Sequence, residues 1–203
     1  MGLFSRQRTV TAVLFAHELS VYALEYAQRG QGKLAYALGL EITVRRDPPV
    51  PRRCAIIEHR RGQEDCRGCW QPELIVFHLW AAYSALNSLN EWTATCVREA
   101  MEKGFVEPAG QMGWTADQAL DFYTTRIVEY TDAFNNHAGL GPMFHLIKQF
   151  SLNITGKSSA ISMVLANEPS GWLNMTSSVN QYVNSYMKSL SKFTRKYRVT
   201  VGS

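Results

Sequence analysis

Residues 66–103 read CRGCWQPELIVFHLWAAYSALNSLNEWTATCVREAMEK, and we expect the rest of the chain to pack around this stretch. Pro72 suits a first helical turn, and neither Gly nor a second Pro follows until Gly104. The spacing therefore predicts one long helix over about 72–103. Its apolar residues recur at every third or fourth position, which places them on one face. That face consists of Ile75, Leu79, Ala82, Leu86, Leu89, Thr93, Cys96 and Ala100.

A membrane span is the competing interpretation of this stretch. His78, Asn87, Asn90 and Glu91 interrupt the apolar run before it reaches the roughly 20 residues that a bilayer requires. Val76, Trp80 and other apolar residues form a second stripe, so neighbours are expected on at least two sides. We therefore expect this helix to be the central helix of a bundle.

The remaining chain predicts further helices around that centre. Helix signals begin near Thr115 and Pro142, and Thr176 or Ser177 can cap the last helix. A first helix is expected from about residue 8 to 29, ended by Gly30. Its apolar positions at helical spacing are Val10, Val13, Leu14, His17, Val21, Leu24 and Ala27.

Length and composition bound the fold class. With 203 residues, 46% hydrophobic and 19% charged, the chain can bury one core and is not generally disordered. We expect an all-α, single-domain helical bundle of six or seven helices over residues 1–203. Four unevenly spaced cysteines do not form a disulfide framework, which favours a cytoplasmic location.

Residues 41–70 are the least core-like part of the sequence. EITVRR at 41–46 alternates apolar and polar residues, and a second short apolar piece covers 54–57. This arm is either a short β-hairpin or irregular. Its candidate binding residues, seven arginines and one tryptophan, are Arg45, Arg46, Arg52, Arg53, Arg60, Arg61, Arg67 and Trp70.

The arginines of this arm favour an acidic partner. They can also contact nucleic-acid phosphates, and Trp70 can stack on a base. The plainer interpretation is a solvated loop with Arg to Asp/Glu pairing, because four acids lie among the seven arginines. A net charge of +4 for the whole chain does not by itself select nucleic acid.

The same arm carries the densest set of metal-ligand residue types. Cys54, His59, Cys66 and Cys69 could supply three thiolates and one imidazole to a structural zinc ion. Cys66 and Cys69 have CxxC spacing, whereas the Cys54 to His59 spacing is unlike that of familiar zinc fingers. The alternatives are ordinary thiols or a redox pair next to a helix start.

The last helix ends in a second basic patch. Its members are Lys188, Lys192, Arg195, Lys196 and Arg198. Cations suit a helix C-terminus, and the apolar face of this helix is expected to dock in the bundle. Binding to a membrane surface is the weaker alternative.

No nucleophile elbow, zinc-protease or dinucleotide motif is present in the sequence. We expect a non-enzymatic binding protein, an assembly or adaptor subunit that contacts an acidic protein partner or forms a homo-oligomer. The second hypothesis is a nucleic-acid-associated protein with a zinc-stabilised arm. The third is a helical enzyme or ligand-binding protein with an aromatic pocket, since many aromatic residues fall on or beside the predicted helices.

Overall fold

The computed structural model describes residues 7–37, 40–44, 55–59, 70–86, 90–111, 113–139, 141–155 and 169–200. This part is mostly helical, and the predicted helical bundle is confirmed. The helices are α1 (Ala12–Ala37), α2 (Trp70–Ser84), α3 (Glu91–Gln111), α4 (Ala116–Asn135), α5 (Pro142–Thr155) and α7 (Pro169–Thr194). The strands are β1 (Arg8–Thr11), β2 (Leu40–Val44), β3 (Ala55–His59) and β4 (Tyr197–Thr200).

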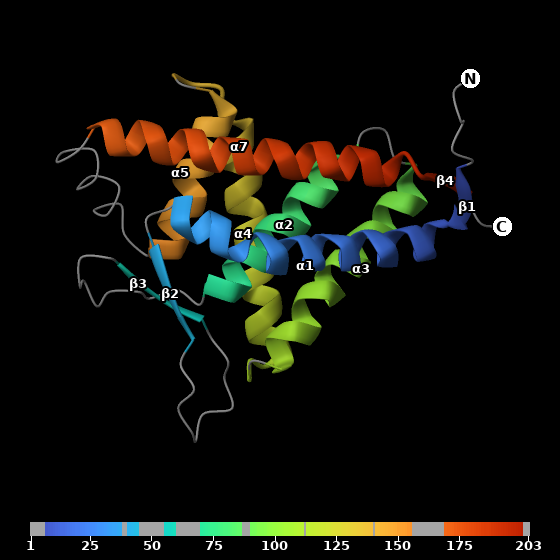
Figure 1. The fold of residues 1–203 in the computed structure, drawn as a ribbon. Helices are drawn as coiled ribbons and strands as arrows, with labels where there is room; N and C mark the ends of the chain where they lie inside the picture. The colour runs from blue at the N-terminus through green and yellow to red at the C-terminus, as the bar shows by residue number, and fades with distance from the viewer. Residues whose placement is uncertain are drawn as a thin grey trace, which may run out of the picture.

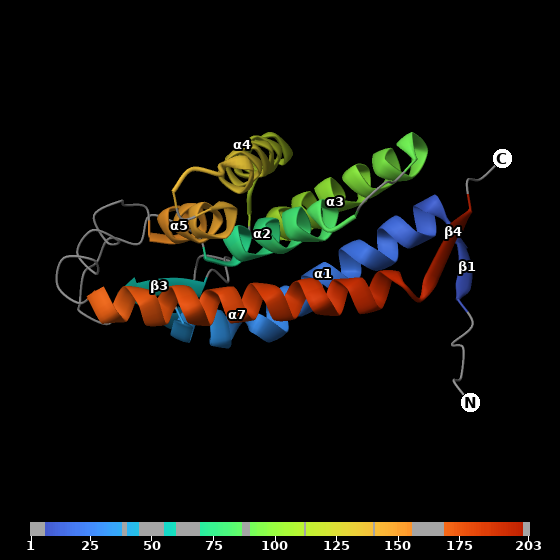
Figure 2. The same ribbon diagram turned by 90° about the horizontal axis from the view of Figure 1, so that it is seen from above.

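Helix α2 is at the centre of the bundle. It is in contact with α1, α3, α4, α5 and α7, and every residue from Pro72 to Ala82 is buried. In Figure 1, α1 and α7 run alongside each other through the length of the molecule. Figure 2 shows α2 and α3 between this pair and α4. The stretch quoted first therefore does supply the central element.

The single helix predicted over 72–103 is wrong in one respect, because the structure divides it into α2 and α3. Asn90 precedes α3, and its side-chain Oδ1 accepts a hydrogen bond from the Thr93 N–H at 2.9 Å. This is N-capping geometry, which starts a new helix. Asn and Ser side chains compete for backbone hydrogen bonds, and the Asn87-Ser88-Leu89-Asn90 run provides three such residues.

The predicted apolar face of the first helix is only partly right: Val10 and Ala27 are buried and Leu24 is partly buried, but its other four residues are not. Val13, Leu14, His17 and Val21 are exposed. The face that α1 buries consists mainly of small side chains: Ala12, Phe15, Ala16, Leu19, Ser20, Ala23 and Ala27. Small side chains let neighbouring helices approach closely, and the tertiary structure selects this face over the more hydrophobic one.

Neither Gly30 nor Gly104 ends a helix, although the sequence predicts both as stops. Gly30 lies within α1, where an added Cβ would stand 1.9 Å from the Tyr182 hydroxyl. Gly104 lies within α3, where a Cβ would stand 2.3 Å from Ser20 Oγ. Both glycines are positions of close helix packing.

Helix α3 continues through Pro108, so the loop predicted at 105–114 is mostly helical. The helix ends in a Schellman arrangement at Gly113, whose φ is +86°. The Gly113 N–H donates to the Gly110 carbonyl at 3.0 Å, and the Trp114 N–H donates to the Ala109 carbonyl at 3.1 Å.

Other local signals are confirmed. Thr115 caps α4 in a capping box with Gln118, and α5 begins at Pro142. Strands β2 and β3 pair antiparallel, which confirms the β-hairpin alternative for the arm. Helix α7 begins at Pro169, earlier than the predicted cap at Thr176 or Ser177, and its last predicted turn is instead strand β4.

The pairing of β1 with β4 is not predicted by the sequence. The two strands are parallel, with Arg8 opposite Tyr197 and Thr11 opposite Thr200. They bring the two ends of the chain together at one end of the molecule, away from α4 and α5 (Figure 1). We call this pair the terminal ribbon.

The close approach at Gly30 can be tested by mutation. The Gly30→Ala variant should lower the free energy of unfolding by about 2 kcal/mol, because its methyl group must displace the Tyr182 ring. Gly110→Ala is the matched control, since its Cβ would have no neighbour within 4 Å. It should raise stability by up to about 1 kcal/mol. Equal effects in urea denaturation would contradict the close packing.

Candidate functional site

The predicted zinc ligands are not tested by the structure. Cys54, Cys66 and Cys69 lie outside the described residues, and His59 is described only through the backbone of β3. Within the described ranges, no group of His, Cys, Asp and Glu side chains could hold a metal ion. Cys96, the cysteine that the structure does describe, is buried and free. The zinc site stays a prediction.

The arginine arm is likewise described only by the hairpin that carries it. Arg45, Arg46, Arg52 and Arg53 belong to the segment that joins β2 to β3, and Arg60, Arg61 and Arg67 follow β3. All seven lie outside the described residues. Trp70 is the first residue of α2, and its side chain is also outside the description.

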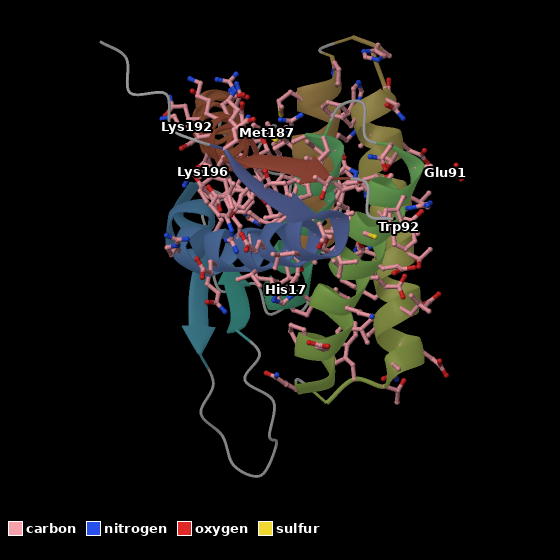
Figure 3. The ribbon with its side chains drawn as sticks, turned by 90° about the vertical axis from the view of Figure 1, so that its right-hand side faces the viewer. His17, Glu91, Trp92, Met187, Lys192 and Lys196 are labelled. Carbon is pink, nitrogen blue, oxygen red and sulfur yellow. The ribbon has the colours of Figure 1, made fainter. Side chains whose placement is uncertain are left out.

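The second basic patch is fully described, and we call it the C-terminal basic surface. Its members Lys188, Lys192, Arg195, Lys196 and Arg198 are all exposed. Lys188, Lys192 and Arg195 follow one another at spacings of four and three, so they form one stripe about 10 Å long. Figure 3 shows Lys192 and Lys196 at the same edge of the molecule.

The opposite face of α7 explains why these cations project outward. Val179, Val183, Tyr186 and Leu190 are buried in the core. Farther along the helix, the Phe193 ring stacks on Tyr22 of α1 with centroids 4.3 Å apart. The apolar face therefore fixes α7 against the bundle, and its basic face is left in solvent.

Among the described residues, the cations of the C-terminal basic surface have no carboxylate bound to them. From residue 169 to 203 the sequence contains no Asp or Glu. None of the five cations forms an ion pair with a described residue, although ion pairs do form elsewhere, at Arg8, Arg29 and Arg126. The surface therefore presents uncompensated positive charge, which suits an acidic ligand.

A buried ion pair, missed by the sequence analysis, joins α2 to α4. Glu73 is 2% exposed, and its carboxylate accepts a hydrogen bond from Arg126 Nε at 2.8 Å. It also accepts one from the hydroxyl of buried Tyr130. Arg126 donates to Glu129 as well, at 2.8 Å, and lies over the Phe122 ring. In the sequence, the indication of this contact is that Glu73 is an acidic residue within the apolar run 72–82.

The pKa of Glu73 is shifted in the way expected of a buried structural ion pair with Arg126. Burial raises the pKa of Glu73, and the neighbouring Arg126 and Tyr130 oppose that rise. Asn153 lies beside them and also favours the charged carboxylate. The amide nitrogen of Asn153 is buried and has no hydrogen-bond partner among the described residues. Asn153 therefore acts on Glu73 as a nearby dipole. With Glu73 closed to solvent, the arrangement holds the α2–α4 crossing.

His78 is the second buried polar group of α2. Its Nδ1 lies 2.8 Å from the Leu74 carbonyl, which can only accept, so Nδ1 carries the proton. Nε2 then accepts a hydrogen bond from the Tyr182 hydroxyl at 2.7 Å. Burial lowers the pKa of His78 to about 4. His78 is therefore a neutral core residue that connects α2 to α7.

The aromatic residues mostly form the core. Trp80, Tyr130 and Phe150 are buried, and Phe77 packs against Phe150 with ring centroids 4.4 Å apart. A surface pocket of about 360 Å³ does lie between α4 and α5, but no Phe, Tyr or Trp lines it. Its lining residues are Glu129, Asp132, Ala133, Asn136, His145, Lys148, Gln149 and Leu152. This pocket does not match the predicted aromatic ligand site.

Comparison with models of known protein families, with curated protein sequences and with solved structures finds no match for this chain. None of the helices in the described part combines the length and the hydropathy that crossing a bilayer requires.

Loss of Arg126 should expose the cost of burying Glu73. The Arg126→Met variant should lower the free energy of unfolding by about 3 kcal/mol at pH 7, because it leaves a buried carboxylate without its cation. Arg126 holds down the pKa of Glu73, so its removal should raise that pKa further, and protonation of the carboxylate should shrink the deficit as pH falls towards 4.5. Urea denaturation at both pH values measures it.

The control for that experiment is Glu73→Gln in the Arg126→Met background. It removes the buried charge, so the double variant should be more stable at pH 7 than Arg126→Met alone. If the double variant has the stability of the single variant at both pH values, the carboxylate is not the source of the loss.

The depressed pKa of His78 predicts acid sensitivity. Its stabilising contribution is present above the ordinary value of 6.5 and is lost as pH falls towards about 4. Between these two pH values the free energy of unfolding should fall by about 3 kcal/mol, because each pH unit contributes about 1.4 kcal/mol. His78→Asn, which retains a donor for the Leu74 carbonyl, should be less stable at pH 7 and should lack this pH dependence. The difference between the two stability curves isolates His78, and parallel curves would refute its titration.

Proposed function

We propose that this protein is a non-enzymatic helical binding protein, an assembly or adaptor subunit that docks an acidic protein partner. The observation that carries the proposal is the C-terminal basic surface, with five exposed cations and no carboxylate partner among the described residues. The arginine arm at 41–70 is proposed as a further contact on the strength of its sequence alone.

The stripe formed by Lys188, Lys192 and Arg195 favours an extended acidic ligand over a single small anion. Lys188 and Lys192 lie one turn apart on α7 and Arg195 directly follows its last residue, so the three cations are distributed over about 10 Å instead of converging on one point. Among the α7 residues whose side chains the structure describes, 177 and 179–194, none is a large apolar residue that is exposed. Recognition at this stripe is therefore electrostatic and should weaken as salt is raised.

The buried polar residues support a scaffold role. Arg126 and Tyr130 both bind Glu73, and His78 binds Leu74 and Tyr182. Their hydrogen bonds are used to hold α2 against α4 and α7. The rigid bundle thereby fixes the direction in which α7 presents its cations.

Neutralising the stripe should weaken binding to an acidic polymer. In Lys188→Gln/Lys192→Gln/Arg195→Gln, affinity for poly-L-glutamate should fall about tenfold at low salt, since each lost exposed pair is worth about 0.5 kcal/mol. Fluorescence anisotropy with a labelled polymer measures the change. The matched control is Arg98→Gln/Lys103→Gln/Lys148→Gln, which removes the same charge from exposed positions on α3 and α5.

The control variant should bind within about twofold of the unmodified protein, because its cations lie outside the basic surface. Equal losses in the two variants would reduce the interaction to net charge and contradict a docking surface. Tight binding to duplex DNA, with a steep salt dependence and no binding to poly-L-glutamate, would instead support the nucleic-acid hypothesis.

A further inference from the structure

The terminal ribbon has fewer strands than parallel sheets usually have. Parallel strands normally lie in larger sheets with both faces covered, and two strands alone are marginally stable. Among the described strands, β1 and β4 pair only with each other. One face of the ribbon packs on the bundle through buried Val10, whereas Thr9, Thr11, Arg198 and Thr200 are exposed on the other.

The hydrogen-bond pattern shows which backbone groups of β1 are left open. The Arg8 N–H donates to the Lys196 carbonyl at 2.7 Å, so Arg8 and Val10 turn their backbone groups towards β4. In a parallel pair the alternate residue faces the other way. Thr9 therefore directs both its N–H and its carbonyl away from β4, and neither meets another backbone group in the described part.

The open edge is bounded at one end by the start of α1. Thr11 Oγ1 accepts a hydrogen bond from the Leu14 N–H at 3.3 Å, as a helix cap does. The segment available for pairing is therefore short and centred on Thr9, between Gln7 and Thr11. A short extended peptide, and not a long strand, fits an edge of this length.

The charged side chains near the terminal ribbon determine which kind of peptide can pair with the open edge of β1. Arg195, Lys196 and Arg198 lie in or next to β4, and Arg8 lies in β1. The nearest described carboxylate, Glu18, is already bound to Arg8 at 2.9 Å and to the Tyr197 hydroxyl. A second copy of this chain would bring like charges together across the edge, which is destabilising. An acidic segment would be attracted.

We propose that an extended acidic segment of the partner protein adds to the open edge of β1 as a third strand. Backbone hydrogen bonds to Thr9 would supply affinity, and Arg198 with the neighbouring cations would select acidic side chains. This inference rests on the proposed function, because it names the way in which the acidic partner is held.

Two peptides of equal charge test the strand addition. One is a peptide of about ten residues with alternating Val and Glu; the other has the same sequence with every residue N-methylated, so that neither of its edges can donate a backbone hydrogen bond. The unmodified full-length protein should bind the first peptide about tenfold more tightly than the second. Fluorescence anisotropy in low salt measures both affinities.

A variant of the edge provides the second test. Thr9→Pro removes the outward N–H without removing a hydrogen bond of the β1–β4 ladder. It should lower affinity for the unmethylated peptide severalfold, whereas Thr9→Val, which keeps the N–H, should bind it as the original protein does. Thermal unfolding monitors whether Thr9→Pro remains folded, and the peptide comparison does not depend on that variant.

The outcomes separate this inference from the proposed function. Equal binding of the two peptides overturns strand addition, and so does failure of both to bind. If poly-L-glutamate still binds in either case, and the Lys188/Lys192/Arg195 variant loses that binding, the acidic-partner proposal stands alone. Loss of binding to N-methylated peptide and to Thr9→Pro together supports the third strand.

Discussion

The close approach of α1 to α3 and α7 sets how the other helices of the bundle can pack. Small side chains of α1, Ser20 among them, leave room for Gly104 of α3, and Gly30 of α1 leaves room for the Tyr182 ring of α7. With α7 held at that distance, the Tyr182 hydroxyl reaches His78 in α2. Two glycines without side chains thus determine where a central polar contact can form.

Helix α2 shows how a chain can bury polar groups without making them available for chemistry. Glu73 and His78 are both buried and hydrogen-bonded: Glu73 binds two residues of α4, and His78 binds Tyr182 of α7 and the Leu74 carbonyl of α2 itself. Burial moves their pKa values in opposite directions, because it disfavours the charged form of each. Their contacts connect α2 to α4 on one side and to α7 on the other, and so position the helix whose outer face carries the C-terminal basic surface.

The α2–α4 crossing and the C-terminal part of α7 differ in how their charges are paired. The α2–α4 crossing pairs Arg126 with two carboxylates, whereas the described part of α7 has no acid to pair with Lys188 or Lys192. Helix α7 leads directly into the terminal ribbon (Figures 1 and 2), and the backbone groups of Thr9 meet no other backbone group among the described residues. An acidic strand would satisfy both the cations and the edge, so the two proposals describe one surface from two kinds of evidence.

The helical class, the N-cap at Thr115, the start of α5 at Pro142 and the basic character of the last helix could all be predicted from the sequence, because each follows from local spacing or local hydrogen bonding. The hairpin of the arm was one of two alternatives that the sequence left open. Tertiary structure alone decided the role of Gly30 and Gly104, the buried face of α1, the partner of Glu73 and the pairing of β1 with β4. Each of these depends on a residue distant in the chain: Tyr182, for example, for Gly30 and Arg126 for Glu73. Residue periodicity shows that a face is apolar or small, but only the neighbour that packs there decides which face is buried.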